Sequence, residues 1–175
     1  MKHCREFLGI LILLLICNPA SAQEFTYLSD IEPVSAEARW FGFVKDYIYG
    51  KYPLILQGKE YKKGILTHAP AKIEYDLAGK YSLFTANIGL WDSGNRISRD
   101  IYNNNERDWR GPGNGVIYEI WCDGNKIYES GLVTWQRDAE IKIIVTGAHL
   151  LTLYVTENGD TDSDWAVWAD AKLHY

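Results

Sequence analysis

Short runs in which apolar and polar residues alternate constrain this chain more than any other feature. Every second residue is apolar over residues 72–77 and again over 84–90, which is the two-residue period of half-buried β-strands. Similar runs follow at 116–122, 126–130, 141–145, 151–155 and 166–173, with turn signals such as Asp123-Gly124 between them. No long stretch has apolar residues at helical spacing, although a short helix near 34–38 fits. The sequence therefore predicts an all-β fold, an antiparallel β-sandwich.

The N-terminal segment has the order of a secretory signal peptide. A basic start and an apolar run precede Ala20-Ser21-Ala22, which supplies the small residues of a cleavage site. The apolar run is too short to span a bilayer comfortably, and no later run replaces it. We therefore expect residues 1–22 to be removed. Residues 23–175 are expected to form one domain that is secreted to the periplasm or the extracellular medium and has no membrane attachment after cleavage.

The charge balance limits the classes of molecule that the chain can bind. Two basic residues and one acidic residue leave with the signal, so 16 basic and 22 acidic residues remain. An acidic chain without clustered Lys and Arg is not expected to bind nucleic acid or an anionic membrane surface.

Cys122 is the single cysteine that remains after the signal is removed, which excludes an intramolecular disulfide. A lipoprotein would use Cys17 instead, but Ile16 stands where lipidation sites usually have a small residue.

Three motifs follow one another in a recognisable order. The first is the glycine-flanked loop Lys63-Gly64-Ile65-Leu66-Thr67-His68-Ala69, the second is the strand and hairpin of residues 119–131, and the third is Trp168-Ala169-Asp170-Ala171-Lys172-Leu173. Together they make the chain similar to the NPCBM family of carbohydrate-binding modules, which occur beside glycoside hydrolases. The resemblance implies a galactose-binding-like, jelly-roll sandwich with a non-catalytic role. It also implies a neutral, galactose-type glycan as the ligand.

Three classes of function fit the sequence. The resemblance favours a secreted, lectin-like carbohydrate-binding module, which would work with a glycoside hydrolase encoded separately. A glycoside hydrolase with Asp92 and Asp164 as its two carboxylates is the second class, but no catalytic motif supports it, and we do not expect an enzyme. The rival class is a cell-surface protein-interaction or structural sandwich that has lost sugar binding. Departures from the family pattern, among them Leu66 and Val167, keep that class open.

Tryptophans supply the candidate sugar platforms. Sugars present an apolar face of C–H groups and a fringe of hydroxyls, so their sites combine a flat aromatic ring with a few polar groups. All seven tryptophans lie after the signal. Trp40, Trp91 and Trp165 are the predicted platforms because each lies in or beside an irregular segment. Trp121 and Trp168 are interpreted as strand packing.

Polar candidates lie close to these tryptophans in the sequence. His68, in its glycine-flanked loop, can donate to a sugar hydroxyl or accept from one without a change of charge. A buried histidine that satisfies backbone groups is the alternative. Lys63 of the same loop and Asp92 complete the predicted carbohydrate-binding residues. The long polar segment 92–114 is either a functional loop or a disordered insertion.

An acidic turn near the end of the chain is a candidate metal site. Glu157, Asp160, Asp162 and Asp164 place carboxylates at short intervals, and carboxylate oxygens are the ligands that Ca²⁺ prefers. An EF-hand is excluded because Trp165 stands where its sharp-turn glycine is needed. The alternative is a solvated acidic turn. Apart from this calcium, no cofactor is expected to be required.

The calcium hypothesis predicts a rise in thermal stability. A ligand that binds only the native state raises the unfolding midpoint as its concentration increases. Adding Ca²⁺ at roughly 10⁻³ M, the weak end of the range for extracellular modules, should therefore raise the midpoint, and a chelator should reverse the effect. A midpoint that neither treatment moves would exclude calcium at this turn.

Overall fold

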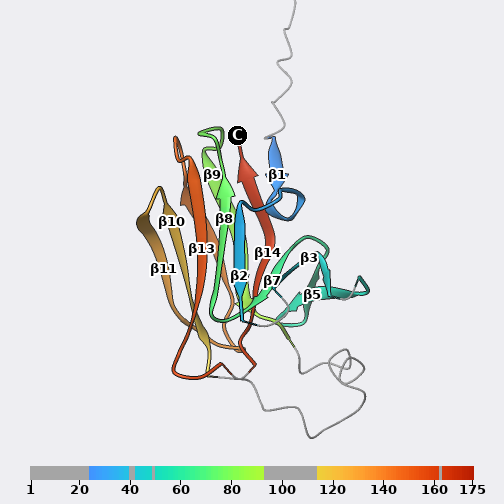
Figure 1. The fold of residues 1–175 in the computed structure, drawn as a ribbon. Coiled ribbons are helices and arrows are strands. Elements are labelled where there is room, and N and C mark those ends of the chain that lie inside the picture. Colours follow the sequence, from blue (N-terminus) through green and yellow to red (C-terminus); the bar gives the residue numbers. More distant parts are fainter. Residues whose placement is uncertain (1–23, 40–41, 49, 93–113, 162) are drawn as a thin grey trace, which may run out of the picture.

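Two antiparallel sheets face each other in the computed structural model, which describes residues 24–39, 42–48, 50–92, 114–161 and 163–175 (Figure 1). One sheet has the order β12 (Ala139–Ile144), β9 (Leu83–Leu90), β14 (Trp165–His174), β7 (Gly64–His68), β3 (Phe43–Lys45), and β1 (Phe25–Tyr27) also pairs with β14. The other has the order β11 (Asn125–Val133), β10 (Val116–Cys122), β13 (Leu150–Glu157), β8 (Ala71–Asp76), β2 (Ser35–Ala38). The predicted antiparallel β-sandwich is confirmed.

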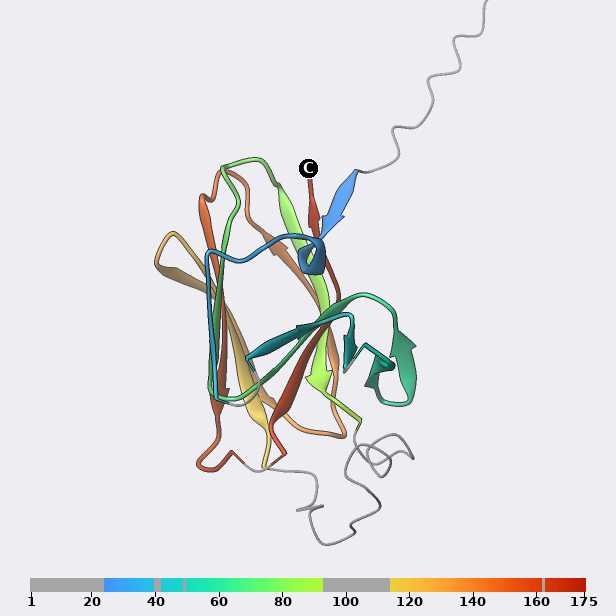
Figure 2. The ribbon, with the colours of Figure 1, turned by 45° about the vertical axis from the view of Figure 1, so that its right-hand side comes forward.

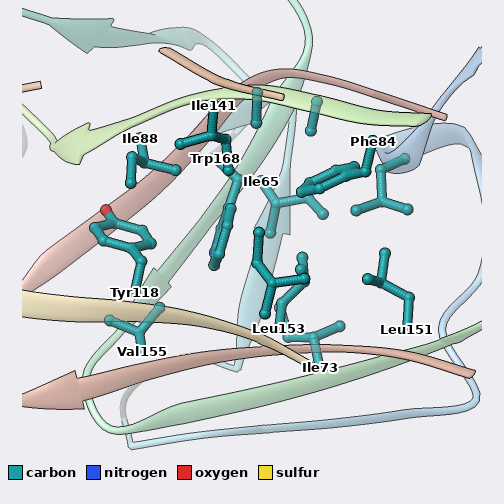
Figure 3. Close-up of a cluster of buried hydrophobic side chains, with 14 of the residues drawn as sticks. Ile65, Ile73, Phe84, Ile88, Tyr118, Ile141, Leu151, Leu153, Val155 and Trp168 are labelled. Atoms are coloured by element: carbon teal, nitrogen blue, oxygen red, sulfur yellow. The ribbon is translucent and has the colours of Figure 1, made fainter. Parts of the chain in front are cut away.

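A single hydrophobic core fills the space between the sheets. Alternate residues of each strand point inward, and Figure 3 shows Phe84, Ile88 and Trp168 of one sheet opposite Ile73 and Leu153 of the other. A fully buried apolar side chain of this size contributes about 1.5–3 kcal/mol to folding. Because most strands of the two sheets contribute inward residues to this core, it accounts for the period-two pattern of the sequence.

A third, smaller layer lies on the outer face of the six-stranded sheet. It consists of β4 (Tyr47–Ile48), β5 (Tyr52–Leu56) and β6 (Lys59–Tyr61), drawn to one side of the sandwich in Figure 2. Leu54 and Leu56 of this layer form a second hydrophobic cluster with Leu66, Trp91 and Val167. The sequence pattern did not predict this layer, because its strands are short and apolar on consecutive positions.

Residues 34–38 form a bend and a strand, so the predicted short helix is wrong. Ser35–Ala38 form β2, which pairs with β8, and the Val34 amide donates to the Glu74 carbonyl at 2.8 Å. Pairing with a sheet edge satisfies backbone groups that a short helix would leave exposed. A 3₁₀ turn, η1 (Leu28–Asp30), lies earlier in the chain. Within the described ranges, no helix is long and apolar enough to cross a membrane.

Gly64 allows β7 and β14 to approach closely. Its φ is 147°, and a Cβ at this position would lie 2.5 Å from the Trp168 carbonyl oxygen and 2.9 Å from the Ala169 Cα. Contacts that short with backbone atoms exclude any side chain. The glycine of the histidine loop is therefore a packing requirement of the sheet.

Tyr118 joins the two sheets through its hydroxyl group. The hydroxyl donates to the Gly89 carbonyl at 2.6 Å and accepts from the Val167 amide at 3.0 Å. Gly89 and Val167 are paired across β9 and β14, so the hydroxyl serves a backbone donor and acceptor inside the core. Burial raises the pKa of Tyr118 well above its ordinary range, and the hydroxyl keeps its proton.

Replacing Tyr118 by Phe should lower the free energy of unfolding by about 1–3 kcal/mol, because two buried backbone groups lose their partner. Urea denaturation measures the change. Tyr47→Phe is the matched control, since Tyr47 is exposed, and it should leave stability nearly unchanged. Equal losses in the two variants would show that the cross-sheet hydrogen bonds contribute nothing.

Candidate functional site

Four of the predicted binding residues meet at one end of the sandwich. Trp165 is paired with His68 across β14 and β7, and the Trp91 amide donates to the Trp165 carbonyl at 2.7 Å. The Asp92 amide donates to the Ile55 carbonyl at 2.9 Å. His68 is the last residue of β7, Trp91 follows β9, and Trp165 begins β14, at the lower end of Figure 2. We call the group of His68, Trp91, Asp92 and Trp165 the loop-end site.

His68 is held in one orientation by two contacts. Its Nδ1 lies 2.9 Å from the Ala69 carbonyl oxygen, and its ring meets the Trp165 ring edge to face, with centroids 4.8 Å apart at 87°. A carbonyl oxygen only accepts, so Nδ1 is the donor of this contact. The side chain is 4% exposed. Only a small part of His68 is therefore open to a ligand.

The two described tryptophans of the loop-end site differ in exposure. Trp91 is 6% exposed and packs in the second hydrophobic cluster, whereas Trp165 packs at the border of that cluster and is half-buried. Asp92 is half-buried beside them. Trp165 therefore offers the larger aromatic surface at this end. Trp40 lies outside the described residues, as does most of the 92–114 segment.

Lys63 does not join the loop-end site. It precedes Gly64, at the opposite end of β7 from His68, and its Nζ donates to Asp30 and, at 2.6 Å, to Asp46. Burial alone would lower the pKa of Lys63, but its hydrogen bonds and charge attraction with these carboxylates raise it above the ordinary value. Lys63 therefore forms an ion cluster with Asp30 and Asp46, which we call the Lys63 ion cluster.

The predicted calcium ligands are spread over different environments. Asp164 is completely buried, Glu157 and Asp160 are exposed, and the Asp160 carboxylate accepts from Asn114 Nδ2 at 3.0 Å. In the part of the chain that the structure describes, no three His, Cys, Asp or Glu side chains gather as metal ligands do. Asp162 lies outside that part, so the calcium site stays a prediction.

Trp135 is an exposed aromatic at the same end that the sequence analysis did not select. It is 50% exposed, in the turn between β11 and β12, and its carbonyl accepts from Gln57 Nε2. Val133 pairs with Val116 and Ala139 with Ile88, which places this turn at the loop end. Trp135 lies in an irregular segment, which is the criterion that selected Trp165. The same criterion could therefore have selected Trp135 from the sequence.

Comparison with known proteins yields one family. The NPCBM/NEW2 domain model matches residues 24–174. A Renibacterium salmoninarum protein named as an endo-alpha-N-acetylgalactosaminidase is 28% identical over 164 residues, which cover 89% of this chain and 10% of that protein. The chain thus spans about a tenth of this relative's length.

Solved structures of CBM51 modules are similar to the whole fold. The CBM51 of Clostridium perfringens GH95, solved with methyl-galactose, has a TM-score of 0.69 and 27% identity over 86% of this chain and 99% of the module. Tandem CBM51 modules of the Streptococcus pneumoniae family 98 glycoside hydrolase give 0.70 and 26%, over 87% of this chain and 48% of theirs. A structure of the M60 catalytic domain with two CBM51 domains of Clostridium perfringens ZmpB gives 0.69 and 29%, over 87% and 15%.

The Lys63 ion cluster predicts a pH-dependent contribution to stability. Burial would raise the pKa of Asp46, but hydrogen bonds from Lys63, Ser29 and the Gly64 amide outweigh burial and hold it below the ordinary 3.8. A depressed carboxyl pKa stabilises the fold above the unfolded value, and that stabilisation is lost as the pH falls through the folded value. Asp46→Asn should therefore lower the urea midpoint at neutral pH, by an amount that shrinks below pH 3.8.

Asparagine tolerates the positive φ of Asp46, 63°, so the variant removes the charge and one acceptor oxygen without straining the backbone. Glu32→Gln is the control, because Glu32 is an exposed partner of Lys45 and exposed pairs contribute little. A deficit of Asp46→Asn that stays constant down to strongly acidic pH would contradict the assignment.

Proposed function

The chain belongs to the NPCBM/NEW2 family, whose members are non-catalytic carbohydrate-binding modules, and we propose that it binds a neutral, galactose-type glycan at the loop-end site. The observation that carries this proposal is the meeting of His68, Asp92 and Trp165 where β7, β9 and β14 end or begin. These residues combine an aromatic surface with groups that can read hydroxyls, which is the chemistry of a sugar site.

Each residue has a separate task in this site. The half-buried Trp165 ring offers a surface for the C–H face of a sugar. His68, oriented by its Nδ1 contact with the Ala69 carbonyl, would hydrogen-bond to a sugar hydroxyl. Asp92, held through its amide on the Ile55 carbonyl, would accept from a second hydroxyl. The buried Trp91 supports the position of Trp165 through their backbone hydrogen bond.

The ligand of one similar structure and the name of one relative support a galactose-type ligand. The CBM51 of Clostridium perfringens GH95 was solved with methyl-galactose, and the Renibacterium salmoninarum relative carries the name of an enzyme acting on N-acetylgalactosaminides. One or two side chains can change hydroxyl preference in such a site. Methyl-galactose is therefore the first ligand to test, followed by its epimers.

The biological role that we propose is targeting. CBM51 modules occur in glycoside hydrolases. A module that holds an enzyme on its substrate raises the effective concentration of that substrate at the active site. In our proposal the domain is exported by its N-terminal signal to the periplasm or the extracellular medium, and there it places a glycoside hydrolase, encoded separately, on a glycan. In this proposal the binding requires no cofactor, and calcium at the acidic turn stays a separate prediction.

Affinity should be weak. A shallow site that covers one or two sugar rings gains little after desolvating many hydroxyls, so we expect a dissociation constant on the order of 10⁻⁵ to 10⁻³ M. A glycan array followed by titration calorimetry identifies the ligand and measures this constant. Turnover of the bound glycan would contradict a non-catalytic module.

Two substitutions test the assigned residues. Trp165→Ala should weaken binding about tenfold or more, the loss expected when a stacking surface is removed. His68→Ala should reduce the discrimination between galactose and its epimers, because it removes a polar group that distinguishes hydroxyl positions. Ile144→Ala is the matched control: Ile144 is 76% exposed and lies at the opposite end of the sandwich. Wild-type protein that retains no glycan, or two variants that bind as the control does, would overturn the proposal.

A further inference from the structure

A pair of aromatic rings lies on the outer face of the five-stranded sheet, away from the loop-end site. Trp121 of β10 and Tyr154 of β13 are half-buried, with ring centroids 5.8 Å apart at 64°. Their chain neighbours Ile120 and Leu153 point into the core, so the two rings point outward. In the described parts of the chain, no element packs over this face; the small third layer covers the other sheet (Figures 1 and 2).

The strand register arranges this face as two adjacent rows of side chains. One row crosses the sheet as Lys126, Trp121, Thr152, Glu74 and Ser35, and the next as Glu129, Glu119, Tyr154, Lys72 and Glu37. Residues directly opposite one another in an antiparallel pair have side chains in contact range. Each aromatic ring therefore has polar side chains on both sides in its own row.

Five of the six charged side chains in these two rows are paired with one another, and the sixth, Glu37, is exposed on the edge strand β2. Lys72 Nζ lies 2.7 Å from Glu74, and Lys126 Nζ lies 3.1 Å from Glu119 and 2.6 Å from Glu129. An ionic partner would have to break these pairs before it could form its own. A neutral ligand can instead hydrogen-bond to the remaining donors and acceptors of the same groups, so the charge arrangement favours a neutral ligand.

Trp121 is fixed in place before any ligand arrives. Its Nε1 donates to one carboxylate oxygen of Glu119 at 2.8 Å, and the other oxygen accepts from Lys126. Two strands away, on β8, Glu74 accepts from Ser35 at 2.6 Å and from Thr152 at 3.4 Å. Side chains that are already ordered lose little conformational freedom on binding, which favours affinity.

We propose that this face is a second glycan-binding surface, for a neutral oligosaccharide. Trp121 and Tyr154 stack on sugar C–H faces, while Lys72, Lys126 and Glu74 hydrogen-bond to hydroxyls. We call these five residues the sheet-face site. The inference rests on the proposed function in one respect: the ligand is a glycan, as at the loop end. Two sites on different faces make one domain bivalent, and binding to a surface bearing many glycans would gain by avidity.

Trp121 provides a direct spectroscopic readout of this site. Its indole N–H gives its own resonance in a ¹⁵N–¹H correlation spectrum, which Trp121→Leu assigns by its disappearance. Titration with methyl-galactose and with lacto-N-tetraose, a neutral tetrasaccharide that contains galactose, should shift this resonance in a saturable manner at roughly millimolar sugar. The amides of Thr152 and Tyr154 should move with it.

Variants separate the two sites. Trp165→Ala should leave the Trp121 shift in place, whereas Tyr154→Leu should weaken the sheet-face response about tenfold. Ile117→Ala, on the same outer face of β10, is the matched control and should change neither response. All variants must retain the wild-type amide pattern elsewhere.

The outcomes are distinct for the two proposals. A Trp121 indole that does not move with either sugar, or moves only when Trp165 is intact, overturns the sheet-face site and leaves the loop-end site standing. Shifts at Trp121 without shifts at Asp92 or Trp165 support the sheet-face site and count against the loop-end assignment. A protein that shows no shift with any sugar overturns both.

Discussion

The strand β14 lies between two hydrophobic layers, and most of the structure follows from its double burial. Ala166 and Trp168 point into the sandwich core, while Val167 and Ala169 point beneath β4–β6. Burial on both faces leaves no solvent-facing side chain over these four positions. It also requires a close fit with β7, which Gly64 provides because a Cβ there would strike the Trp168 carbonyl.

A bulge then returns β14 to ordinary sheet geometry. The register with β9 shifts between Ala169 and Lys172, and Asp170 has a φ of 50°. Strict alternation would put Ala171 on the same face as Ala169, but Ala171 packs in the sandwich core. Past the bulge, the outer face of the strand needs no further covering layer. At the other end of the strand, the same constraint fixes Trp165 beside His68 and Trp91, and this builds the loop-end site.

The strands and the main core could be predicted from the sequence because period-two alternation reports burial of one face. The same reasoning missed the third layer, since residues 52–56 are apolar in succession and carry no alternation. Leu66 shows the consequence. It stands where the family usually has glycine, and it is 2% exposed in the second cluster. Its side chain therefore packs beneath β4–β6 and does not line the loop-end site.

The structure brings His68, Trp91, Asp92 and Trp165 to one end of the sandwich because all four lie where strands end or begin. Lys63 was grouped with His68 by its place in one motif, but Lys63 precedes the extended strand β7 and His68 ends it, so the two lie at opposite ends of the strand. Exposure could not be predicted from the sequence either. Trp91 is buried because it packs against the third layer, whereas Trp135 is exposed. The most direct measurement is a crystal structure of the protein with methyl-galactose. We predict a sugar ring against Trp165 with a hydroxyl within hydrogen-bond distance of His68. A sugar bound elsewhere on the domain, with none at the loop end, would contradict the account.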